Sequence, residues 1–405
     1  MGTSILCERV SRAIVVASSS VWIEGEALRQ LDEVSQLPGM VMSVGLPDLH
    51  PGKGGPVGVA LASVGLIYPS LVGSDVGCGM ALWTTDLPAS KAKPEKLAAR
   101  MNGLDSMWDG DISDIVQKFQ LTPTPFDSSL GTTGFGNHFI EVQAVHEVID
   151  SATLSDIGVD LTRLCILVHT GSRGLGESIL RRAVAERGKS GLHSDSAEAA
   201  AYLVEHDNAV RWAEANRTLC ARRAAASIRA DIQPVLDICH NSVEKTSFGG
   251  HPVWLHRKGA APVKGGPIVI PGSRGDFSYL VIPLDCSQTL MSVAHGAGRK
   301  MARHEASAKV KDSKEKFGGR SNPCGGWVIC GDKKIVAEED PVAYKDVGSV
   351  VTSLVEAGLV RIIAILRPVV TFKVSEREKN TGNNDYRDSW RNSRKAVAAE
   401  KGRMP

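Results

Sequence analysis

The stretch RLCILVHTGSRGLG, residues 163–176, shows the pattern that decides the fold of this chain. Its first six residues are mostly aliphatic, which predicts a short buried strand. The strand stops at His169, and a glycine-rich loop with Arg173 follows at once. Apolar runs of this kind, separated by glycine and proline turns, recur along the chain and predict many short strands. We expect such strands at residues 14–16, 40–42, 59–61, 253–255, 268–270 and 279–281, and one or two more within 360–373.

One long block between these strands has helical character. Residues 194–236 are rich in alanine, and Ala199 and Leu203 are spaced for one face of a helix. Ser196 is placed to cap the N-terminus of this helix, and Pro234 is expected to interrupt or end it. Shorter helices are predicted at 90–101 and 344–358, and turn structure at 46–58.

Composition excludes several classes of protein. The chain has 405 residues, of which 42% are hydrophobic and 23% charged, so it is too apolar for a disordered protein. No uncharged apolar run approaches the roughly 18 residues of a transmembrane helix, so we expect no membrane partner. A net charge of +2 argues against a polycationic nucleic-acid binder but leaves room for a local basic groove.

The chain shows no linker and no repeat of fixed period before residue 373. We therefore expect an α+β fold: a single large mixed domain over residues 1–373, with central β-sheets flanked by helices. Residues 374–405 form a polar C-terminal extension, which we interpret as solvated. A contact with a partner helix or with RNA through Tyr386 and Trp390 is the alternative. Eight scattered cysteines, without a secretory signal, predict reduced thiols and a cytoplasmic location.

Five side chains form a candidate metal site. Asp75 and Cys78 lie three residues apart among glycines in GSDVGCGM, and His138, His169 and His256 lie next to or at the ends of apolar strands. If the thiolate bridges two ions, the five donors make three bonds to each ion and leave open positions. Mixed nitrogen, oxygen and sulfur donors suit zinc or a transition metal better than magnesium. Each residue taken alone also has an ordinary structural explanation, and we leave His50, His240 and His251 undecided.

Three glycine-rich loops, residues 171–176, 271–278 and 295–299, have the composition of anion-binding loops. Small residues let backbone N–H groups approach phosphate oxygens, and Arg173 and Arg299 add bidentate donors. The standard P-loop and Rossmann signatures are absent from the sequence.

Taken together, these motifs resemble the RtcB family of RNA-splicing ligases. The likeness runs in family order across residues 1–373. It rests on DLHPGKGGPVG (48–58), DVGCGM (75–80), GNHFIEV (136–142), HTGSRGLG (169–176), HRKGA (256–260), PGSRGDFSYLV (271–281), HGAGR (295–299), AYKDV (343–347) and RPVVTFK (367–373).

The resemblance implies an RNA ligase that joins a 3′-phosphate or 2′,3′-cyclic phosphate end to a 5′-hydroxyl end, using GTP and two Mn²⁺ ions per active site. It implies the same five metal ligands, Asp75, Cys78, His138, His169 and His256, and a covalent GMP on His295. Arg173 and Arg299 are then candidates for RNA or phosphate contacts. An activating or repair protein is a further partner that the resemblance leaves open. The implied GTP contacts are Asn137, His138, Phe139, Ile140, Glu141, His256, Pro271, Gly272, Ser273, Arg274, Ser278, Gly296, Ala297, Gly298 and Lys373.

The chain departs from the family pattern in several places. Arg274 stands where the family usually has methionine and adds a charge close to the expected nucleotide, and Ala294 replaces a serine. The segment between residues 80 and 131 is short, and the chain continues beyond Lys373, where family members usually end. Two other functions stay open: a metal phosphohydrolase or cyclic phosphodiesterase on the same site, and a non-catalytic RNA-binding subunit.

Overall fold

The computed structural model describes residues 6–10, 13–187, 190–312, 322 and 324–375. Residues 1–375 group into one compact unit of mixed α and β structure. Most of the expected extension, including Tyr386 and Trp390, lies outside the described residues. None of the helices in the described part is long and apolar enough to cross a membrane.

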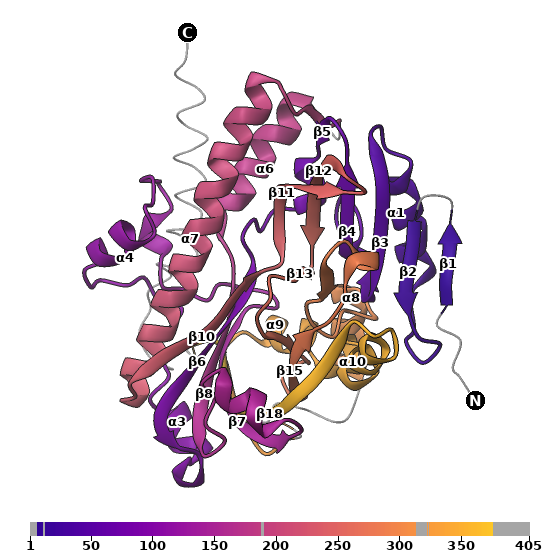
Figure 1. The fold of residues 1–405 in the computed structure, drawn as a ribbon. Coiled ribbons are helices and arrows are strands. Elements are labelled where there is room, and N and C mark those ends of the chain that lie inside the picture. Colours follow the sequence, from indigo (N-terminus) through magenta and orange to yellow (C-terminus); the bar gives the residue numbers. More distant parts are fainter. Residues whose placement is uncertain (1–5, 11–12, 188–189, 313–321, 323, 376–405) are drawn as a thin grey trace. The chain divides into compact units, whose positions relative to one another are not determined.

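Two large β-sheets form the frame of this unit (Figure 1). The first has six strands, and only its β2–β3 pair is parallel. Helix α1 (Gly25–Ser35) connects β2 to β3 and packs its buried Ala27 and Leu31 against this sheet. The strand order is β1 (Leu6–Val10), β2 (Ala13–Ala17), β3 (Met40–His50), β4 (Val57–Ser63), β12 (His251–Lys258) and β11 (Asn241–Phe248).

The second sheet has eight strands. Seven pair antiparallel in the order β10 (Ile232–Cys239), β6 (Gly79–Pro88), β8 (Arg163–Thr170), β7 (Phe139–Val148), β18 (Val360–Val374), β15 (Ser278–Pro283) and β14 (Ile268–Pro271). The eighth, β17 (Trp327–Cys330), pairs parallel with β18. Two small pairs complete the β structure: β13 (Ala260–Pro262) with β16 (Ser292–Ala294), and β5 (Leu66–Ile67) with β9 (Leu192–His193).

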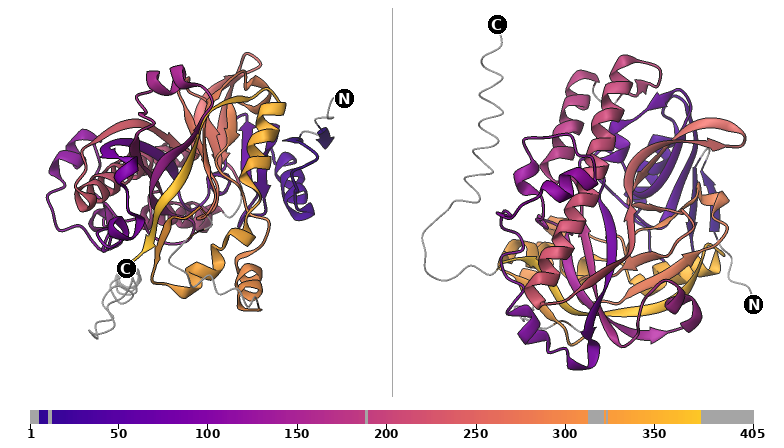
Figure 2. Two further views of the ribbon diagram at one scale, coloured as in Figure 1. Left: turned by 90° about the horizontal axis from the view of Figure 1, so that it is seen from below. Right: turned by 60° about the vertical axis from the view of Figure 1, so that its left-hand side comes forward.

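Helix α7 (Ala197–Ile228) is the long helix that the alanine-rich block predicts. It packs against β8, β6 and β10 of the second sheet (Figure 1), and α6 (Gly174–Arg187) lies beside it (Figure 2). Its small residues allow this close packing, because Ala221 and Ala224 share a buried cluster with Ile166 of β8. The predicted N-cap is confirmed, since the Ser196 side chain accepts a hydrogen bond from the Ala199 backbone N–H at 3.1 Å.

The other helices are short, apart from α8 and α10 with ten residues each. The α-helices are α2 (Pro69–Val72), α3 (Pro94–Ala98), α4 (Ser113–Lys118), α5 (Ser151–Asp156), α8 (Arg303–Asp312), α9 (Lys333–Glu338) and α10 (Val347–Glu356). The 3₁₀ turns are η1 (Ala89–Lys91), η2 (Asp127–Ser129), η3 (Ser287–Thr289) and η4 (Pro341–Ala343).

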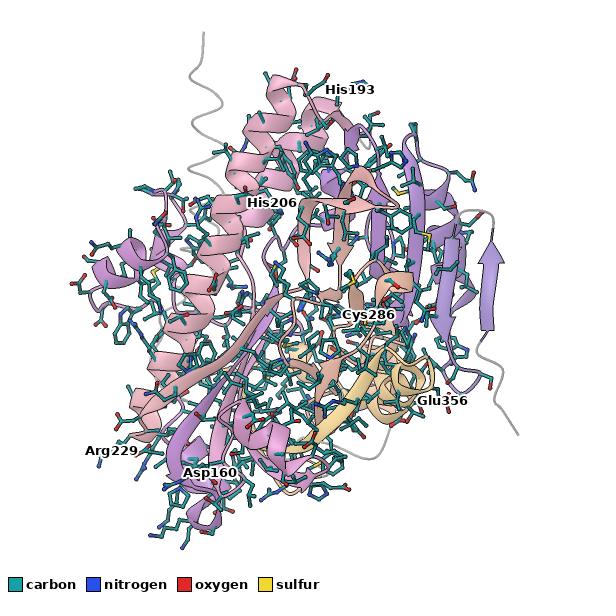
Figure 3. All side chains as sticks on the ribbon, viewed as in Figure 1. Asp160, His193, His206, Arg229, Cys286 and Glu356 are labelled. Carbon is teal, nitrogen blue, oxygen red and sulfur yellow. The ribbon has the colours of Figure 1, made fainter. Side chains whose placement is uncertain are left out.

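Three expectations about boundaries were wrong. Helix α7 ends at Ile228, where Arg229 adopts a left-handed conformation (labelled in Figure 3), and Pro234 lies within strand β10 instead. The turn expected from residue 46 begins only after His50, because β3 continues, buried, through an irregularity in its pairing with β4. The helix expected at 90–101 is split into η1 and α3.

Candidate functional site

Four neighbouring strands of the second sheet bring polar side chains to one edge. In the register of the sheet, Gly79 at the start of β6 lies opposite both Thr170 at the end of β8 and Cys239 at the end of β10. Phe139 at the start of β7 lies opposite His169. The residues flanking these strand ends therefore meet at the same edge, although they are far apart in the sequence.

The Cys78 thiol lies at the centre of this edge. Its Sγ is 3.4 Å from Nε2 of His138 and 3.3 Å from Nε2 of His169. The Asp75 carboxylate lies 2.8 Å from Nε2 of His138. Cys78, His138 and His169 are buried and Asp75 is partly exposed. The structure thus brings together four of the five side chains expected to bind metal.

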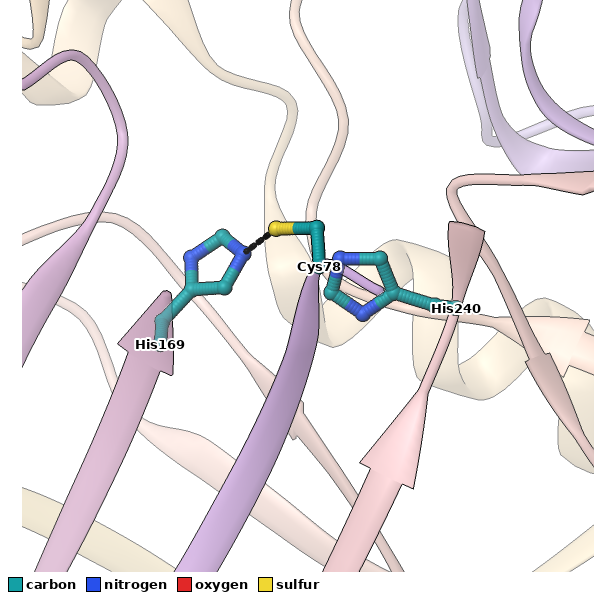
Figure 4. A group of neighbouring side chains, drawn as sticks. All are labelled: Cys78, His169 and His240. Atoms are coloured by element: carbon teal, nitrogen blue, oxygen red, sulfur yellow. Dashed lines mark hydrogen bonds between the residues drawn. The ribbon is translucent and has the colours of Figure 1, made fainter. Parts of the chain in front are cut away.

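A fifth side chain, that of His240, joins these four. His240 directly follows strand β10. Cys78, His169 and His240 have donor atoms within 4.8 Å of one another (Figure 4). Asp75, Cys78 and His138 form a second group of the same kind. The two groups share only the Cys78 thiol, so one thiolate would be within reach of an ion held in either group.

The expectation for His256 is not met. It sits within strand β12, opposite Leu61 of β4, and its side chain is fully buried. Its Nε2 accepts a hydrogen bond from the Tyr68 backbone N–H at 2.9 Å, and its Nδ1 lies 3.3 Å from the carbonyl oxygen of Leu61. Both ring nitrogens are therefore engaged away from the cluster. His240 carried the same signal, an imidazole at a strand end, but nothing in the sequence favoured it over His256.

The protonation states suit coordination. Burial lowers the pKa of His169 and of His240 well below the usual value, so both imidazoles are neutral. Burial opposes ionisation of Asp75, but His138 and Arg173 outweigh it and lower the pKa of the carboxyl. Burial and the Asp75 carboxylate raise the pKa of the Cys78 thiol, so a metal ion must displace its proton to bind. This donor set fits a transition metal.

A second constellation lies next to this cluster. The His295 ring is 4.6 Å from the His240 ring, measured between centroids. Its Nδ1 lies 2.6 Å from Oδ2 of Asp48, which also accepts a hydrogen bond from the His295 backbone N–H at 3.2 Å. Asp48 is fully buried. The carboxylate can only accept, so Nδ1 is the donor, and in a neutral ring the lone pair then lies on Nε2. Nothing in the sequence links Asp48 to His295.

The position of Asp48 is itself fixed by its surroundings. The ammonium group of Lys345 donates to the backbone carbonyls of Pro47 and Leu49, at 3.0 and 2.7 Å. A Cβ atom at Gly298 would lie 2.2 Å from the carbonyl oxygen of Asp48, so only glycine fits there. The 295–299 loop and the end of β3 are thereby packed into direct contact.

His295 opens onto a cavity of about 230 Å³. Most of the residues expected to contact GTP line it, whereas His138, Ile140, Ser278 and His256 do not. Of the two arginines expected to contact RNA or phosphate, Arg299 lines the cavity and Arg173 does not. The GTP-contact candidates that line it are Asn137, Phe139, Glu141, Pro271, Gly272, Ser273, Arg274, Gly296, Ala297, Gly298 and Lys373. His169, expected to bind metal, also lines it. The cavity is also lined by residues for which no contact was expected: His50, Val57, Met80, Arg303, Glu339, Tyr344 and Thr371.

Glu141 is a buried carboxyl in the cavity wall. It accepts hydrogen bonds from Gln143 at 2.7 Å and from the Thr371 hydroxyl. Gln143 also donates to Ser278. Ser278 is therefore linked to Glu141 through Gln143, although it does not line the cavity itself. Burial raises the pKa of Glu141 to about 7, against the opposing effect of its hydrogen bonds. The carboxyl therefore changes its charge near neutral pH.

Comparison with known proteins decides the family of this chain. The family model described as tRNA-splicing ligase RtcB matches residues 30–122 and 120–374. The chain belongs to the RtcB family. The RNA-splicing ligase RtcB2 of Escherichia coli is 44% identical over 364 residues, covering 90% of this chain and 96% of the relative. The RNA-splicing ligases RtcB of Mycobacterium tuberculosis and of Escherichia coli K12 are 29% and 27% identical, over 84% and 88% of this chain and 99% and 96% of the relatives.

Two arginines of this RtcB chain, Arg299 and Arg274, make contacts within the protein that the sequence did not predict. Arg299 is mostly committed within the protein, because it donates to the Met301 and Glu338 carbonyls and to Glu339 and Tyr344. Its role is to anchor the loop, which leaves little of it to contact RNA.

The added charge of Arg274 is also neutralised inside the RtcB fold. Its guanidinium pairs with Asp340 at 3.0 Å and donates to the Val336 carbonyl at 2.9 Å. Both partners of the ion pair are nearly buried, at 8% and 9% exposure of the side chain. Arg274 therefore ties the 271–278 loop to the segment around α9, beside the cavity.

Proposed function

We propose that this RtcB-family RNA ligase uses GTP and two Mn²⁺ ions to join an RNA 3′-phosphate or 2′,3′-cyclic phosphate end to a 5′-hydroxyl end, through GMP bound covalently to His295. The observation that carries the proposal is the His295–Asp48 pair, which lies between a cavity and a cluster of metal-type ligands. A nucleophile, a charge-stabilising site and room for a nucleotide are the parts that nucleotidyl transfer needs.

The first step uses the lone pair of His295. Asp48 holds the ring with Nδ1 protonated, so Nε2 can attack the α-phosphorus of GTP. A nitrogen–phosphorus bond forms, and the bond to the departing pyrophosphate breaks. Asp48 also stabilises the positive charge that the ring gains as it attacks, much as a carboxylate supports histidine in hydrolases.

Asp75, Cys78, His138, His169 and His240 are the proposed ligands of the two ions. Manganese held there supplies positive charge that offsets the negative charge of the triphosphate. The neutral imidazoles of His169 and His240 are ready to donate their lone pairs, and the proton of Cys78 must leave.

Two further transfers complete the reaction. An oxygen of the RNA 3′-phosphate attacks the phosphorus on His295, which releases Nε2 and leaves GMP on the RNA end. The RNA 5′-hydroxyl then attacks the 3′-phosphate phosphorus, a phosphodiester bond forms, and GMP leaves. A cyclic phosphate must first be opened by water to a 3′-phosphate. Arg173 and Arg303 are the proposed contacts for the RNA phosphates, because Arg303 lines the cavity and both arginines lie against the same loop, at Gly134 and Gly136.

Glu141 is the proposed acceptor for the guanine edge. An ionised carboxylate in the cavity wall can accept two N–H groups of guanine, whereas adenine presents a different pattern. Lys373, at 6.0 Å from the centroid of the Phe139 ring, is the proposed cation near the nucleotide. The cytoplasmic location and an activating partner stay predictions from the sequence.

The test is covalent labelling with radioactive GTP and Mn²⁺. The wild-type protein should acquire an acid-labile, alkali-stable GMP label, and His295→Ala should acquire none. Cys78→Ala should also lose the label, because both proposed ions need its thiolate. Absence of label on wild-type protein with bound metal confirmed would overturn the proposal and favour a phosphohydrolase, which needs no adduct.

A further inference from the structure

Two consecutive residues of helix α7, Asn216 and Arg217, are buried polar side chains behind the metal-ligand cluster. Their exposed fractions are 0% and 1%. Burial of an arginine is costly unless every charge and donor finds a partner. We propose that this pair is a positioning device that holds the segments bearing the metal ligands in register for metal binding. The proposal rests on the proposed metal site and assigns that site's geometry to a helix that contributes no ligand.

Arg217 connects three of these segments. Its guanidinium donates to the carbonyl of Gly77 at 2.7 Å and to the carbonyl of Thr170 at 3.0 Å. It also makes a bidentate ion pair with Asp237, with distances of 2.6 to 2.9 Å. Gly77 immediately precedes Cys78, Thr170 follows directly after His169, and Asp237 lies on the strand that leads to His240.

Asn216 connects the remaining segment. Its amide oxygen accepts from the backbone N–H groups of Gly131 and Thr132, at 2.7 and 3.2 Å. Its amide nitrogen donates to the Thr132 carbonyl, to the Thr170 hydroxyl and to the Gly171 carbonyl, at 3.2, 3.3 and 3.3 Å. Asn216 thereby joins the loop before His138 to the end of β8.

The link from this loop to the His138 ring is direct. The Thr133 carbonyl accepts from Nδ1 of His138 at 3.1 Å and from the Thr170 hydroxyl at 2.8 Å. That bond orients the imidazole so that Nε2 faces Cys78 and Asp75. Hydrogen bonds from outside the ligand set are a common means of fixing a metal-binding histidine.

The packing around α7 leaves these segments little freedom to move. A Cβ at Gly77 would lie 2.7 Å from Cβ of Ala213, and one at Gly79 would lie 3.0 Å from the guanidinium carbon of Arg217. The ligand loop is thus pressed directly onto the helix. A single arginine, with planar donors pointing in several directions, can hold three backbone segments together, whereas lysine offers one flexible point of contact.

Substitution of Arg217 by lysine tests the proposal with Co²⁺ as the probe. Cobalt bound to a thiolate gives an absorption band that reports both affinity and ligand geometry. Arg217→Lys keeps a buried cation opposite Asp237 but loses the planar guanidinium, which donates to several acceptors at once. We expect it to bind Co²⁺ roughly 10- to 100-fold more weakly than wild type, the range found for lost supporting hydrogen bonds, with an altered band.

The matched control is Arg222→Lys on the same helix. Arg222 is exposed and pairs with Asp114 at the surface, at 2.6 Å. We expect wild-type affinity and an unchanged spectrum. The unfolding temperature of each metal-free variant is measured in parallel. If Arg217→Lys loses stability but binds Co²⁺ with the affinity and spectrum of wild type, the pair is merely structural and the proposal is wrong.

Two further variants keep the outcome decisive. If Arg217→Lys does not fold, Asn216→Ala is judged by the same criterion, because it removes the Asn216 bonds and keeps the ion pair. If wild-type protein shows no thiolate band, or if Cys78→Ala keeps it, the proposed metal site fails, and the positioning role that rests on it falls with it. A thiolate band in wild type that is unchanged in both substituted proteins overturns the positioning role alone.

Discussion

At the scale of single residues, the site depends on pairs whose members are far apart in the sequence. Asp48 and His295 are separated by 247 positions, and the hydrogen bond between them decides which ring nitrogen faces the carboxylate. Glu141 likewise accepts a hydrogen bond from Thr371, 230 positions away. The chemistry of each residue is set by a neighbour that its own motif does not contain.

Asp48→Asn should slow formation of the covalent GMP adduct. An amide can donate toward Nδ1 and favours the other tautomer, so the attacking lone pair is lost in part of the molecules. We expect a drop of roughly 10²- to 10⁴-fold in the single-turnover labelling rate, as for a carboxylate that orients histidine. The exposed turn residue Asp285 provides the control, since Asp285→Asn should label at the wild-type rate. A wild-type rate in Asp48→Asn would remove Asp48 from the mechanism.

Binding of GTP should depend on pH through Glu141. Its pKa of about 7 is raised by burial, so the ionised form that accepts guanine N–H groups gains population as pH rises. Between about pH 6 and about pH 8, affinity should increase by about tenfold, following the ionised fraction. Calorimetry in a His295→Ala background separates binding from labelling. Glu141→Gln should flatten this rise, and an identical rise in that variant would show that another group is responsible.

At the scale of elements, the ends of strands decide which residues meet. Strands β10, β6, β8 and β7 are neighbours, and their register places Cys239, Gly79, Thr170 and Phe139 along one edge. Strand β12 belongs to the other sheet, so the His256 that it carries faces Tyr68 and Leu61. The choice between two histidines only 16 positions apart thus follows from sheet membership.

His240→Ala should weaken Co²⁺ binding by at least about tenfold, because it removes a ligand and not a supporting contact. His256→Ala provides the comparison, and its metal affinity should stay close to that of wild type. It should instead lower the free energy of unfolding by about 1–3 kcal/mol, since the buried Tyr68 N–H loses its acceptor. Titration with Co²⁺ and chemical denaturation measure the two effects. The reverse pattern would restore His256 to the metal site.

At the scale of the whole molecule, the near-neutral net charge is compatible with a local group of positive charges. The net charge is +2, yet Arg173 and Arg303 both lie next to the glycine-rich loop at residues 131–136: a Cβ at Gly134 would overlap the Arg173 guanidinium, and one at Gly136 would lie 3.0 Å from Arg303. Arg303 is 52% exposed. Binding of RNA should therefore rest on a few local contacts and not on bulk charge.

The salt dependence of RNA binding tests this idea. Each phosphate contact in a single strand contributes about −0.7 to the slope of log affinity against log salt. Arg173→Ala should reduce the size of that slope by about 0.7, measured by fluorescence anisotropy with a 3′-phosphorylated oligonucleotide. Arg29→Ala, at an exposed arginine of α1, should leave the slope unchanged. A slope that falls equally in both variants would indicate diffuse charge and no local contact.

The sequence by itself determined the elements that local pattern controls. Apolar runs predicted β8 and β15, the alanine-rich block predicted α7 with its Ser196 cap, and the ordered motifs predicted the RtcB family. These features depend on residues that are close together in the chain, so they can be predicted from the sequence alone. Glycine turns and strand ends also pointed to Asp75, Cys78, His138 and His169, which lie close together in the structure.

Only the tertiary structure decided which distant residues touch. It replaced His256 by His240, joined Asp48 to His295, and turned Arg299 and Arg274 into internal anchors. It also revealed Asn216 and Arg217 as the buried link between the ligand segments. The physical reason is that strand register and sheet membership depend on pairing across hundreds of residues. Local sequence determines which residues carry polar or metal-binding groups, whereas the packing of the sheets determines which of these groups meet.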